Sequence, residues 1–338
     1  MSASVASGTE ELVGLLRDLP GPDPAAREGV AARAGRALRP AGALSRLDEV
    51  AAWLGGWQRT DRPAVHRPAA VLFAADHGVT VRGVTAYPSS VTASVVKAIE
   101  AGAATAPVMA RQAGVEVTVV DVGVGFPTGD LAVEAALDAE RFAECVEVGR
   151  RSVADLTADL LVLGEMGIGN TTAAAAVSAA LFGGPAAHWV GPGAGLDAEG
   201  LARKTAVVQA ARRRTAGAGP LDVLRELGGA ELAALAGAAV EARRRSLPVL
   251  LDGYVVTAAV APLALVSADA LDHCLAAHRS PEPGHGRLLA RLGLRPLLEL
   301  DMRLGEGSGG LLAVPLIRMA AAAVTDVTTF DEWGLEDR

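Results

Sequence analysis

Short apolar runs that end in aspartate or glycine recur along most of the chain, and alanine-rich segments separate them. The runs lie at 70–76, 117–121, 160–164 and 249–252. The segments between them have helical character and include 90–114, 171–182 and 198–216. Strands that alternate with helices predict a parallel α/β sheet whose strands are buried on both faces. Ligands of such sheets bind beyond the carboxyl ends of the strands, where the aspartates and glycines of this chain fall.

The two ends of the chain have a different pattern. Apolar residues recur at helical spacing in the segments 10–19, 24–38 and 44–57. Near the other end, a glycine-rich turn leads into an apolar helix at 305–324. We expect the ends, 1–65 and 301–338, to form a smaller helical domain. An α/β nucleotide-binding domain at 66–300 would lie between them.

Charge and hydropathy exclude several classes of protein. The net charge is −8, and the arginine triplets at 212–214 and 243–245 end helical stretches, which favours solvated helix ends over nucleic-acid binding. Glycine or proline interrupts the uncharged runs at 166–196 and 253–268, and the N-terminus lacks the features of a secretion signal. The two cysteines match no disulfide or metal pattern. We therefore expect a cytoplasmic protein with no membrane span and no nucleic-acid partner.

Two residue types are rare in this chain. Of the 31 basic residues only Lys97 and Lys204 are lysine, and Asn170 is the only asparagine. Such a bias suggests a genome that avoids the codons for lysine and asparagine. A residue type that survives against this pressure is a candidate for a chemical role.

The strongest local motif is GEMGIGNTT at 164–172, where a predicted strand leads through a glycine-rich loop into a helix. Glycines let the backbone approach an anion, Thr171 or Thr172 can cap the helix, and a helix N-terminus favours phosphate. A tight structural turn explains the glycines equally well. The spacing matches neither the P-loop nor the dinucleotide fingerprint. Glu165 is unusual here, because a carboxylate beside a phosphate is costly unless it contacts a ribose hydroxyl or a catalytic partner.

A second motif, RLGEGSGG at 303–310, places one carboxylate among glycines. Little water is expected around Glu306, and burial would raise its pKa, as a general base requires. A solvent-facing loop glutamate is the alternative interpretation of this motif.

Other polar clusters carry weaker signals. The segments 76–78 and 252–254 end predicted strands, and their polar residues are either ligand contacts or turn residues. The segment 278–285 is polar, but its spacing is not that of a zinc site. No metal site and no Ser–His–Asp or Cys–His arrangement is expected.

Six segments, in this order, resemble the nicotinate-nucleotide–dimethylbenzimidazole phosphoribosyltransferases, the family that builds the lower nucleotide loop of cobalamin. These segments, which span nearly the whole chain, are 38–47, 75–79, 164–172, 191–195, 250–253 and 303–309. The resemblance implies a Rossmann-like parallel sheet flanked by helices, a smaller helical domain and a homodimer.

The resemblance also implies roles for individual residues. Glu306 would be the catalytic base, and Glu165 would stabilise an oxocarbenium-like transition state. The phosphate and ribose of the nucleotide would be held by Gly167, Ile168, Gly169, Asn170, Thr171, Gly193 and Lys204. The pocket for the base would be lined by Tyr87, Ser280 and Leu304. Many members of the family have glutamines near this pocket, where this chain has Ser89, Ser90, Ser94 and Val95, so the preferred base is not predicted.

The substrates implied are nicotinate mononucleotide and a benzimidazole base, and the reaction is expected to need no metal and no cofactor. The cationic pyridinium is already a good leaving group, whereas the attacking base must lose an N–H proton. Two other functions remain open. One is a nucleotide-dependent oxidoreductase, although the dinucleotide fingerprint is missing. The other is a catalytically silent relative that binds nucleotides, although Glu306 is present.

Overall fold

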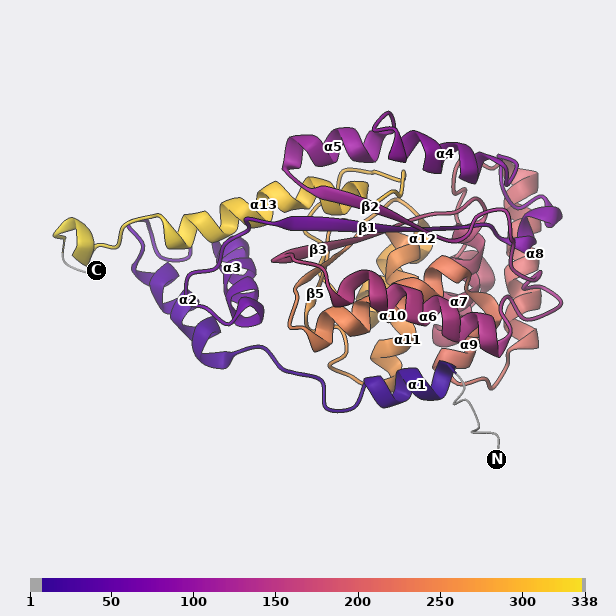
Figure 1. Cartoon of the computed structure of the whole chain (residues 1–338), viewed down its shortest axis with the longest axis horizontal. Coiled ribbons are helices and arrows are strands. Elements are labelled where there is room, and N and C mark those ends of the chain that lie inside the picture. The colour runs from indigo at the N-terminus through magenta and orange to yellow at the C-terminus, as the bar shows by residue number, and fades with distance from the viewer. Residues whose placement is uncertain (1–7, 336–338) are drawn as a thin grey trace.

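The computed structural model describes residues 8–335 and is built around one parallel β-sheet (Figure 1). Its strands are β1 (Pro68–Ala75), β2 (Glu116–Gly123), β3 (Leu160–Met166), β4 (Val249–Leu251) and β5 (Cys274–Ala276). They are ordered β2-β1-β3-β4-β5, and every neighbouring pair is parallel. The α/β class and the parallel sheet flanked by helices are therefore confirmed. The sequence did not predict β5.

Helices cover both faces of the sheet, as Figure 1 shows. One face carries α4 (Val91–Glu100), α5 (Thr105–Ala113) and the first part of α13 (Ser308–Thr325). The other face carries α6 (Ala139–Ala154), α7 (Asn170–Phe182), α9 (Pro220–Leu227), α10 (Ala230–Arg244) and α11 (Tyr254–Val266). Next to α7 and α11 lie α8 (Ala198–Arg214) and α12 (Pro283–Leu292). The segment 90–114, read above as continuously helical, is divided into α4 and α5.

Alternate residues of the central strands belong to two separate hydrophobic cores, one on each face of the sheet. Val71 and Phe73 belong to the core under α6, α7 and α10, whereas Ala70 and Leu72 belong to the core under α5 and α13. Side chains of successive strand residues point to opposite faces, so a strand buried on both faces reads as one continuous apolar run. This is why the runs at 70–76 and 160–164 identified central strands.

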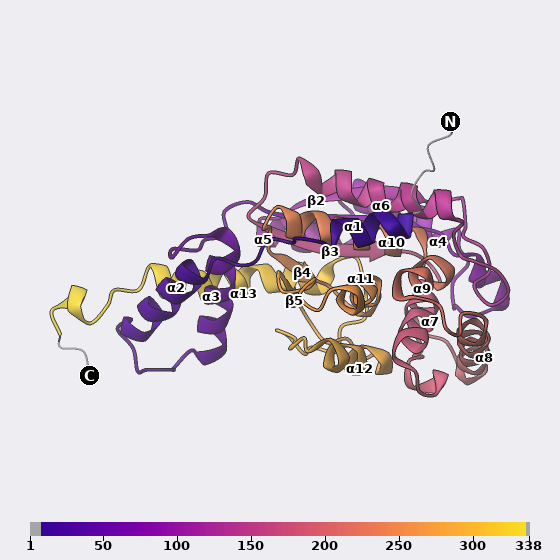
Figure 2. The same cartoon turned by 90° about the horizontal axis from the view of Figure 1, so that it is seen from below.

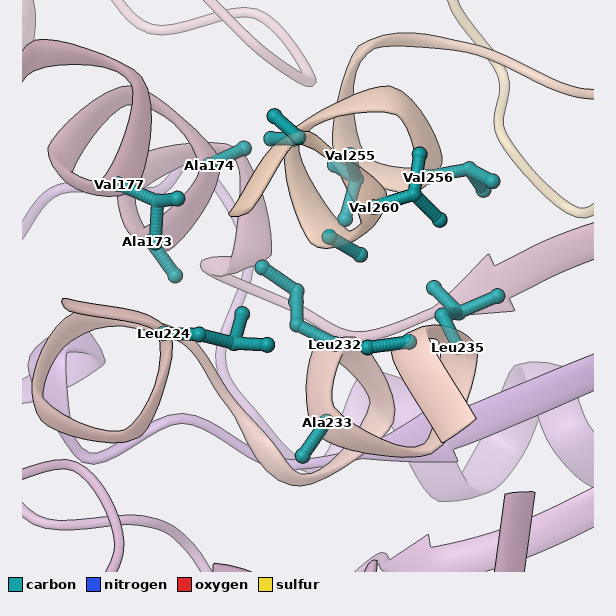
Figure 3. Close-up of a cluster of buried hydrophobic side chains, with 14 of the residues drawn as sticks. Ala173, Ala174, Val177, Leu224, Leu232, Ala233, Leu235, Val255, Val256 and Val260 are labelled. Carbon is teal, nitrogen blue, oxygen red and sulfur yellow. The ribbon is translucent and has the colours of Figure 1, made fainter. Parts of the chain in front are cut away.

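Small aliphatic side chains fill the larger core and let the helices approach closely. Figure 3 shows alanine, valine and leucine side chains of α7, α9, α10 and α11 converging, among them Ala173, Leu224, Leu232 and Val256. Where α6 crosses α10, a Cβ added at Gly149 would lie 1.9 Å from the carbonyl oxygen of Ala234. This approach leaves no room for a side chain, so the crossing depends on glycine.

The helices of the N-terminal segment do not all pack together. The helices α2 (Pro24–Arg36) and α3 (Ser45–Gln58) lie with the end of α13 beside the sheet, where Arg33 Nε donates to the carbonyl of Val324 at 2.9 Å (Figure 2). By contrast, α1 (Gly8–Leu15) packs on α6, and its Leu12 belongs to the larger core. The division into domains at 1–65, 66–300 and 301–338 stays a prediction. Residues 1–7 of the N-terminus judged above for a secretion signal lie outside the described residues.

One helix, α13, is long and apolar enough to cross a membrane by length and composition. The sequence predicts this apolar helix, which was not considered above as a membrane span. In the fold, 61% of this 18-residue window is buried, and α13 packs against α3, α5 and β3. Packing inside the protein accounts for its apolar character.

Candidate active site

A cavity of about 310 Å³ opens beyond the carboxyl ends of β1, β3 and β4. All of the site residues predicted above line it, namely Tyr87, Glu165, Gly167, Ile168, Gly169, Asn170, Thr171, Gly193, Lys204, Ser280, Leu304 and Glu306. They come from segments up to 219 residues apart, counted as 306 minus 87. The fold brings the predicted residues together, and their chemical roles stay predictions.

The glycine loop turns sharply between β3 and α7. Gly169 has φ +97° and directly precedes Asn170, the first residue of α7. A Cβ at Gly169 would lie 2.8 Å from Thr80 Cγ2, and one at Gly167 would lie 2.8 Å from the carbonyl oxygen of Ala75. Both the positive φ and the close approach therefore favour glycine. The loop directs the N-terminus of α7 at the cavity, a position that attracts anions.

A buried lysine lies beside this helix N-terminus. Lys204, on α8, is 1% exposed and donates to Thr171 Oγ1 at 2.8 Å and to the carbonyl of Gly191 at 3.1 Å. Burial lowers the pKa of Lys204 to about 8, and the negative charge of Glu282 acts in the opposite direction. Lys204 is thus positioned as a buried cation for an anionic group.

Glu165 lies near the end of β3 and is almost completely buried. Its side chain accepts a hydrogen bond from Asn170 Nδ2. Burial raises the pKa of Glu165 to about 8, and the charges of Asp252 and Glu231 act in the same direction. At neutral pH this pKa favours the protonated form of the carboxyl group.

Glu306 occupies a strained turn between two glycines. Its φ is +58°, and Gly305 and Gly307 have φ +82° and +71°. The amide of Glu306 donates to the carbonyl of Glu165 at 3.0 Å, and a Cβ at Gly305 would lie 2.7 Å from Glu165 Oε1. The glycines thus let the turn lie directly against Glu165. A positive φ outside glycine is uncommon and is often found at functional sites.

The Glu306 side chain is buried and has one oxygen atom without a hydrogen-bond partner among the described residues. It is 7% exposed, and that oxygen atom is Oε2. Burial raises the pKa of Glu306, and the amide of Ala106 at the start of α5 acts in the opposite direction. The solvent-facing alternative for this glutamate is therefore wrong.

A buried aspartate fixes the helix that follows Glu306. Asp252, at the end of β4, accepts hydrogen bonds from the amides of Gly309 and Gly310 at 2.7 and 3.2 Å. Burial raises the pKa of Asp252 to about 7. The sequence left open whether this residue contacts a ligand or ends a strand. The structure shows it holding the first turn of α13.

The opposite part of the cavity is apolar and open. Tyr87 and Leu304 are 50% and 49% exposed, so both stand at the rim. Ser280 is buried, and its amide donates to His285 Nδ1 at 3.0 Å. Val95 lines the cavity, whereas Ser89, Ser90 and Ser94 are not among its lining residues. This part of the cavity suits a flat, mostly apolar ring.

Two charged residues of the cavity received no role from the sequence. Glu282 Oε1 accepts from the amide of Gly193 at 2.8 Å, and Arg303 Nη1 donates to the carbonyl of the same residue at 2.9 Å. Glu282 belongs to the polar segment 278–285, and Arg303 belongs to the motif at 303–310. Their residue types were visible, but only the fold places them on Gly193.

No group of three or more His, Cys, Asp or Glu side chains within residues 8–335 is arranged to hold a metal ion. The arrangement that does exist has two ends. The N-terminus of α7 and the buried Lys204 form one end of the cavity, and the buried carboxyl groups of Glu165 and Glu306 form the other end. The fold and this cavity define an α/β protein with a site that suits a small anionic ligand beside buried carboxyl groups.

Comparison with known proteins identifies the family. A family model described as phosphoribosyltransferase matches residues 19–335. Curated relatives from Ruegeria pomeroyi and Rhizobium meliloti, both named nicotinate-nucleotide–dimethylbenzimidazole phosphoribosyltransferase, are each 47% identical over 96% of this chain and 96% of their own length. The crystal structure of CobT from Thermus thermophilus has a TM-score of 0.88, is 42% identical, and matches 93% of this chain and 100% of that one.

The chain belongs to the nicotinate-nucleotide–dimethylbenzimidazole phosphoribosyltransferase family. It is accordingly a transferase of pentosyl groups, and the resemblance stated from the sequence is confirmed. The alternatives of an oxidoreductase and of a catalytically silent relative are set aside by this membership.

Proposed function

We propose that the chain transfers the 5-phosphoribosyl group of nicotinate mononucleotide to 5,6-dimethylbenzimidazole or a related base. The products are α-ribazole 5′-phosphate, which serves the assembly of the cobalamin nucleotide loop, and nicotinate, which is the leaving group. The single observation that carries this proposal is the placement of Glu306. It is buried, lacks a partner for Oε2 among residues 8–335, and lines the same cavity as Lys204 and the N-terminus of α7.

The nucleotide is held by its phosphate at the end formed by α7 and α8. Gly167, Ile168 and Gly169 of the loop, Asn170 and Thr171 at the start of α7, and Lys204 line this position. The wall on the other side is Gly193, whose lack of a side chain keeps the space open, because a Cβ there would lie 3.0 Å from Thr171 Oγ1. This end binds and orients, and it takes no part in bond breaking.

The base lies at the other end, between the apolar rim and Glu306. Tyr87 and Leu304 cover its ring, and Ser280 lies deeper in the pocket. Glu306 removes the N–H proton of the base while a ring nitrogen attacks C1′ of the ribose. The bond between C1′ and the pyridinium nitrogen breaks, and its electron pair neutralises the ring, which leaves as nicotinate. Attack opposite to the leaving group inverts C1′ and gives the α-ribotide.

Glu165 stabilises the positive charge that develops on the ribose. Burial raises its pKa to about 8, which favours the protonated form at neutral pH. The cationic pyridinium ring of the nucleotide beside it favours the ionised form, so binding of substrate generates the carboxylate where the reaction needs it.

Assembly and location complete the proposal. The enzyme acts as a homodimer in the cytoplasm. Support for an interface comes from apolar side chains exposed on α13 and after it, of which Met319 and Trp333 are 59% and 67% exposed. Light scattering of the purified protein gives the mass in solution, and a monomer would contradict the dimer.

The first experiment measures release of nicotinate from nicotinate mononucleotide with and without 5,6-dimethylbenzimidazole. We expect release only when the base is present, together with formation of one α-ribotide per nicotinate. Release without base would mean that the enzyme is a hydrolase. No release with this base, with adenine or with a phenolic acceptor would contradict the proposed transfer.

A further inference from the structure

Arg303 connects the two ends of the cavity. It precedes Glu306 by three residues, and its Nη1 atom donates to the carbonyl of Gly193 at 2.9 Å. Gly193 belongs to the wall of the phosphate end, 110 positions away in the sequence. The guanidinium group therefore reaches from the turn that carries Glu306 to the place where the phosphate is expected.

Few cationic side chains line the cavity. Three glutamates line it, Glu165, Glu282 and Glu306. Only two residues of the lining carry positively charged side chains at neutral pH, Lys204 and Arg303. A phosphate monoester carries a charge between −1.5 and −2 at neutral pH as a typical value. One lysine whose pKa burial lowers to about 8 is a weak counterion for such a group near three carboxyl groups.

Lys204 and Arg303 meet at Gly193 from two sides. A Cβ at Gly193 would lie 3.4 Å from Lys204 Nζ, while Arg303 Nη1 is bonded to the carbonyl of the same glycine. Glu282 fixes the amide of Gly193 through a hydrogen bond of 2.8 Å. Gly193 thus lies beside both cations, so a phosphate bound next to it would face both.

The Arg303 side chain has more N–H donors than its one hydrogen bond uses. A guanidinium group carries five N–H donors, and its fork matches phosphate oxygens in a bidentate arrangement. The carbonyl of Gly193 is the one acceptor recorded for Arg303 among residues 8–335. Arg303 is exposed and lines the cavity, so its other N–H donors are available to an anion that enters.

We propose that Arg303 is a second cation that binds the 5′-phosphate of the nucleotide together with Lys204. The inference rests on the proposed function, because it assumes a phosphorylated nucleotide in the cavity. It assigns Arg303 to substrate binding, whereas a residue that only joined two loops would support the fold.

The test uses Arg303→Met and Arg303→Lys. We expect Arg303→Met to raise the KM for nicotinate mononucleotide roughly tenfold or more, since a hydrogen bond between charged groups is lost, with a smaller change in kcat. The KM for the base should stay within about twofold. Arg303→Lys restores part of the loss because the charge remains. Ribose 5-phosphate, which carries the phosphate but no ring, should inhibit competitively, and Arg303→Met should weaken this inhibition by the same factor.

The matched control is Arg111→Met. Arg111 is also exposed and also donates Nη1 to a glycine carbonyl, that of Gly102 at 3.2 Å, but it does not line the cavity. Its KM values should equal those of the wild type. The ionic strength is held constant, because any change of net charge alters long-range attraction of the substrate.

Three outcomes would overturn the inference. If both Arg303→Met and Arg303→Lys raise the KM for the nucleotide and the KM for the base by the same factor, Arg303 only holds the loops in place. If Arg303→Met raises the KM for the nucleotide but leaves inhibition by ribose 5-phosphate unchanged, Arg303 binds the nicotinate carboxylate instead. Absence of inhibition of the wild type by ribose 5-phosphate would argue against a phosphate site. A wild type without base-dependent release contradicts the proposed function itself, and the two failures are thereby distinguished.

Discussion

The phosphate end and the carboxyl end of the cavity respond to the same burial in opposite ways. Burial lowers the pKa of Lys204 to about 8, and it raises the pKa of Glu165 to about 8 and that of Asp252 to about 7. Loss of water disfavours the charged form of every group, so acids and bases are both driven toward neutrality. At neutral pH these shifts leave Lys204 mostly charged and Glu165 mostly neutral, and a cationic ring beside Glu165 would favour its charged form.

In the proposed mechanism, one end of the cavity binds the nucleotide and the other end carries out the reaction. Lys204 already has neighbours that hold it in place, Thr171 and the carbonyl of Gly191. Glu306 has a buried oxygen with no partner among residues 8–335 and a positive φ, which is a costly arrangement. Changes at the first end should act on KM, and changes at the second end should act on kcat.

The largest effect is expected for Glu306→Gln. The amide keeps the shape of the side chain but does not accept the proton of the base, so kcat should fall by roughly 10²-fold or more. The dissociation constant for nicotinate mononucleotide, measured by calorimetry, should change little. The control is Glu299→Gln, which alters an exposed glutamate that pairs with Arg279. A normal kcat in Glu306→Gln would remove this residue from the mechanism and with it the division between the two ends.

A smaller effect is expected for Lys204→Met. Loss of a buried cation should raise the KM for the nucleotide by roughly tenfold to a hundredfold and leave kcat nearly unchanged. Lys97→Met is the matched control, because Lys97 is the other lysine of the chain and is exposed on α4. A fall in kcat with unchanged KM would place Lys204 in the reaction itself.

The pH dependence sharpens this prediction. Because its pKa is lowered to about 8, Lys204 loses its proton as the pH rises through that value rather than near 10.5. The charged form binds phosphate, so the KM of the wild type should rise above about pH 8. The KM of Lys204→Met should show no such rise. A parallel rise in both proteins would assign the titration to another group.

The two ends also differ in how far the sequence predicts them. The glycine loop and the start of α7 are contiguous at 164–172, so a strand, a loop and a helix N-terminus could be recognised locally. The contact between the Glu306 turn and Glu165 joins residues 141 positions apart, counted as 306 minus 165. Glycines at 305 and 307 indicated a turn, but not the carboxyl group against which it lies. Family resemblance, rather than the pattern itself, assigned the role of Glu306.

The other features that the sequence did not predict have physical explanations. The strand β5 has three residues, too few for a recognisable apolar run, and it ends two residues before the polar segment 278–285. Glu282 and Arg303 are ordinary charged residues until the fold places both on Gly193. The helix α1 has the same apolar spacing as α2 and α3, and spacing alone does not say which partner a helix packs against.

The smallest effect, and the most direct comparison of the two ends, is the proton balance of nucleotide binding. At pH 7 Glu165 is mostly protonated, since its pKa is about 8, and a cationic ring beside it lowers that pKa. Binding of nicotinate mononucleotide should therefore release a fraction of a proton. Lys204 is already mostly protonated at pH 7, so its own uptake is small. Calorimetry in buffers of different ionisation enthalpy measures the net release.

Glu165→Gln is the decisive variant, because glutamine keeps the acceptor for Asn170 Nδ2 but has no proton to lose. Its binding should proceed without release at pH 7. At pH 8 the net proton release by the wild type should be smaller than at pH 7. At that pH Lys204 takes up a proton on binding while Glu165 gives one away. Equal release by wild type and Glu165→Gln at pH 7 would trace the proton to Asp252 or Glu306. In that case Glu165 would remain neutral through the reaction, and Glu306 would be the one carboxylate facing the cationic ribose.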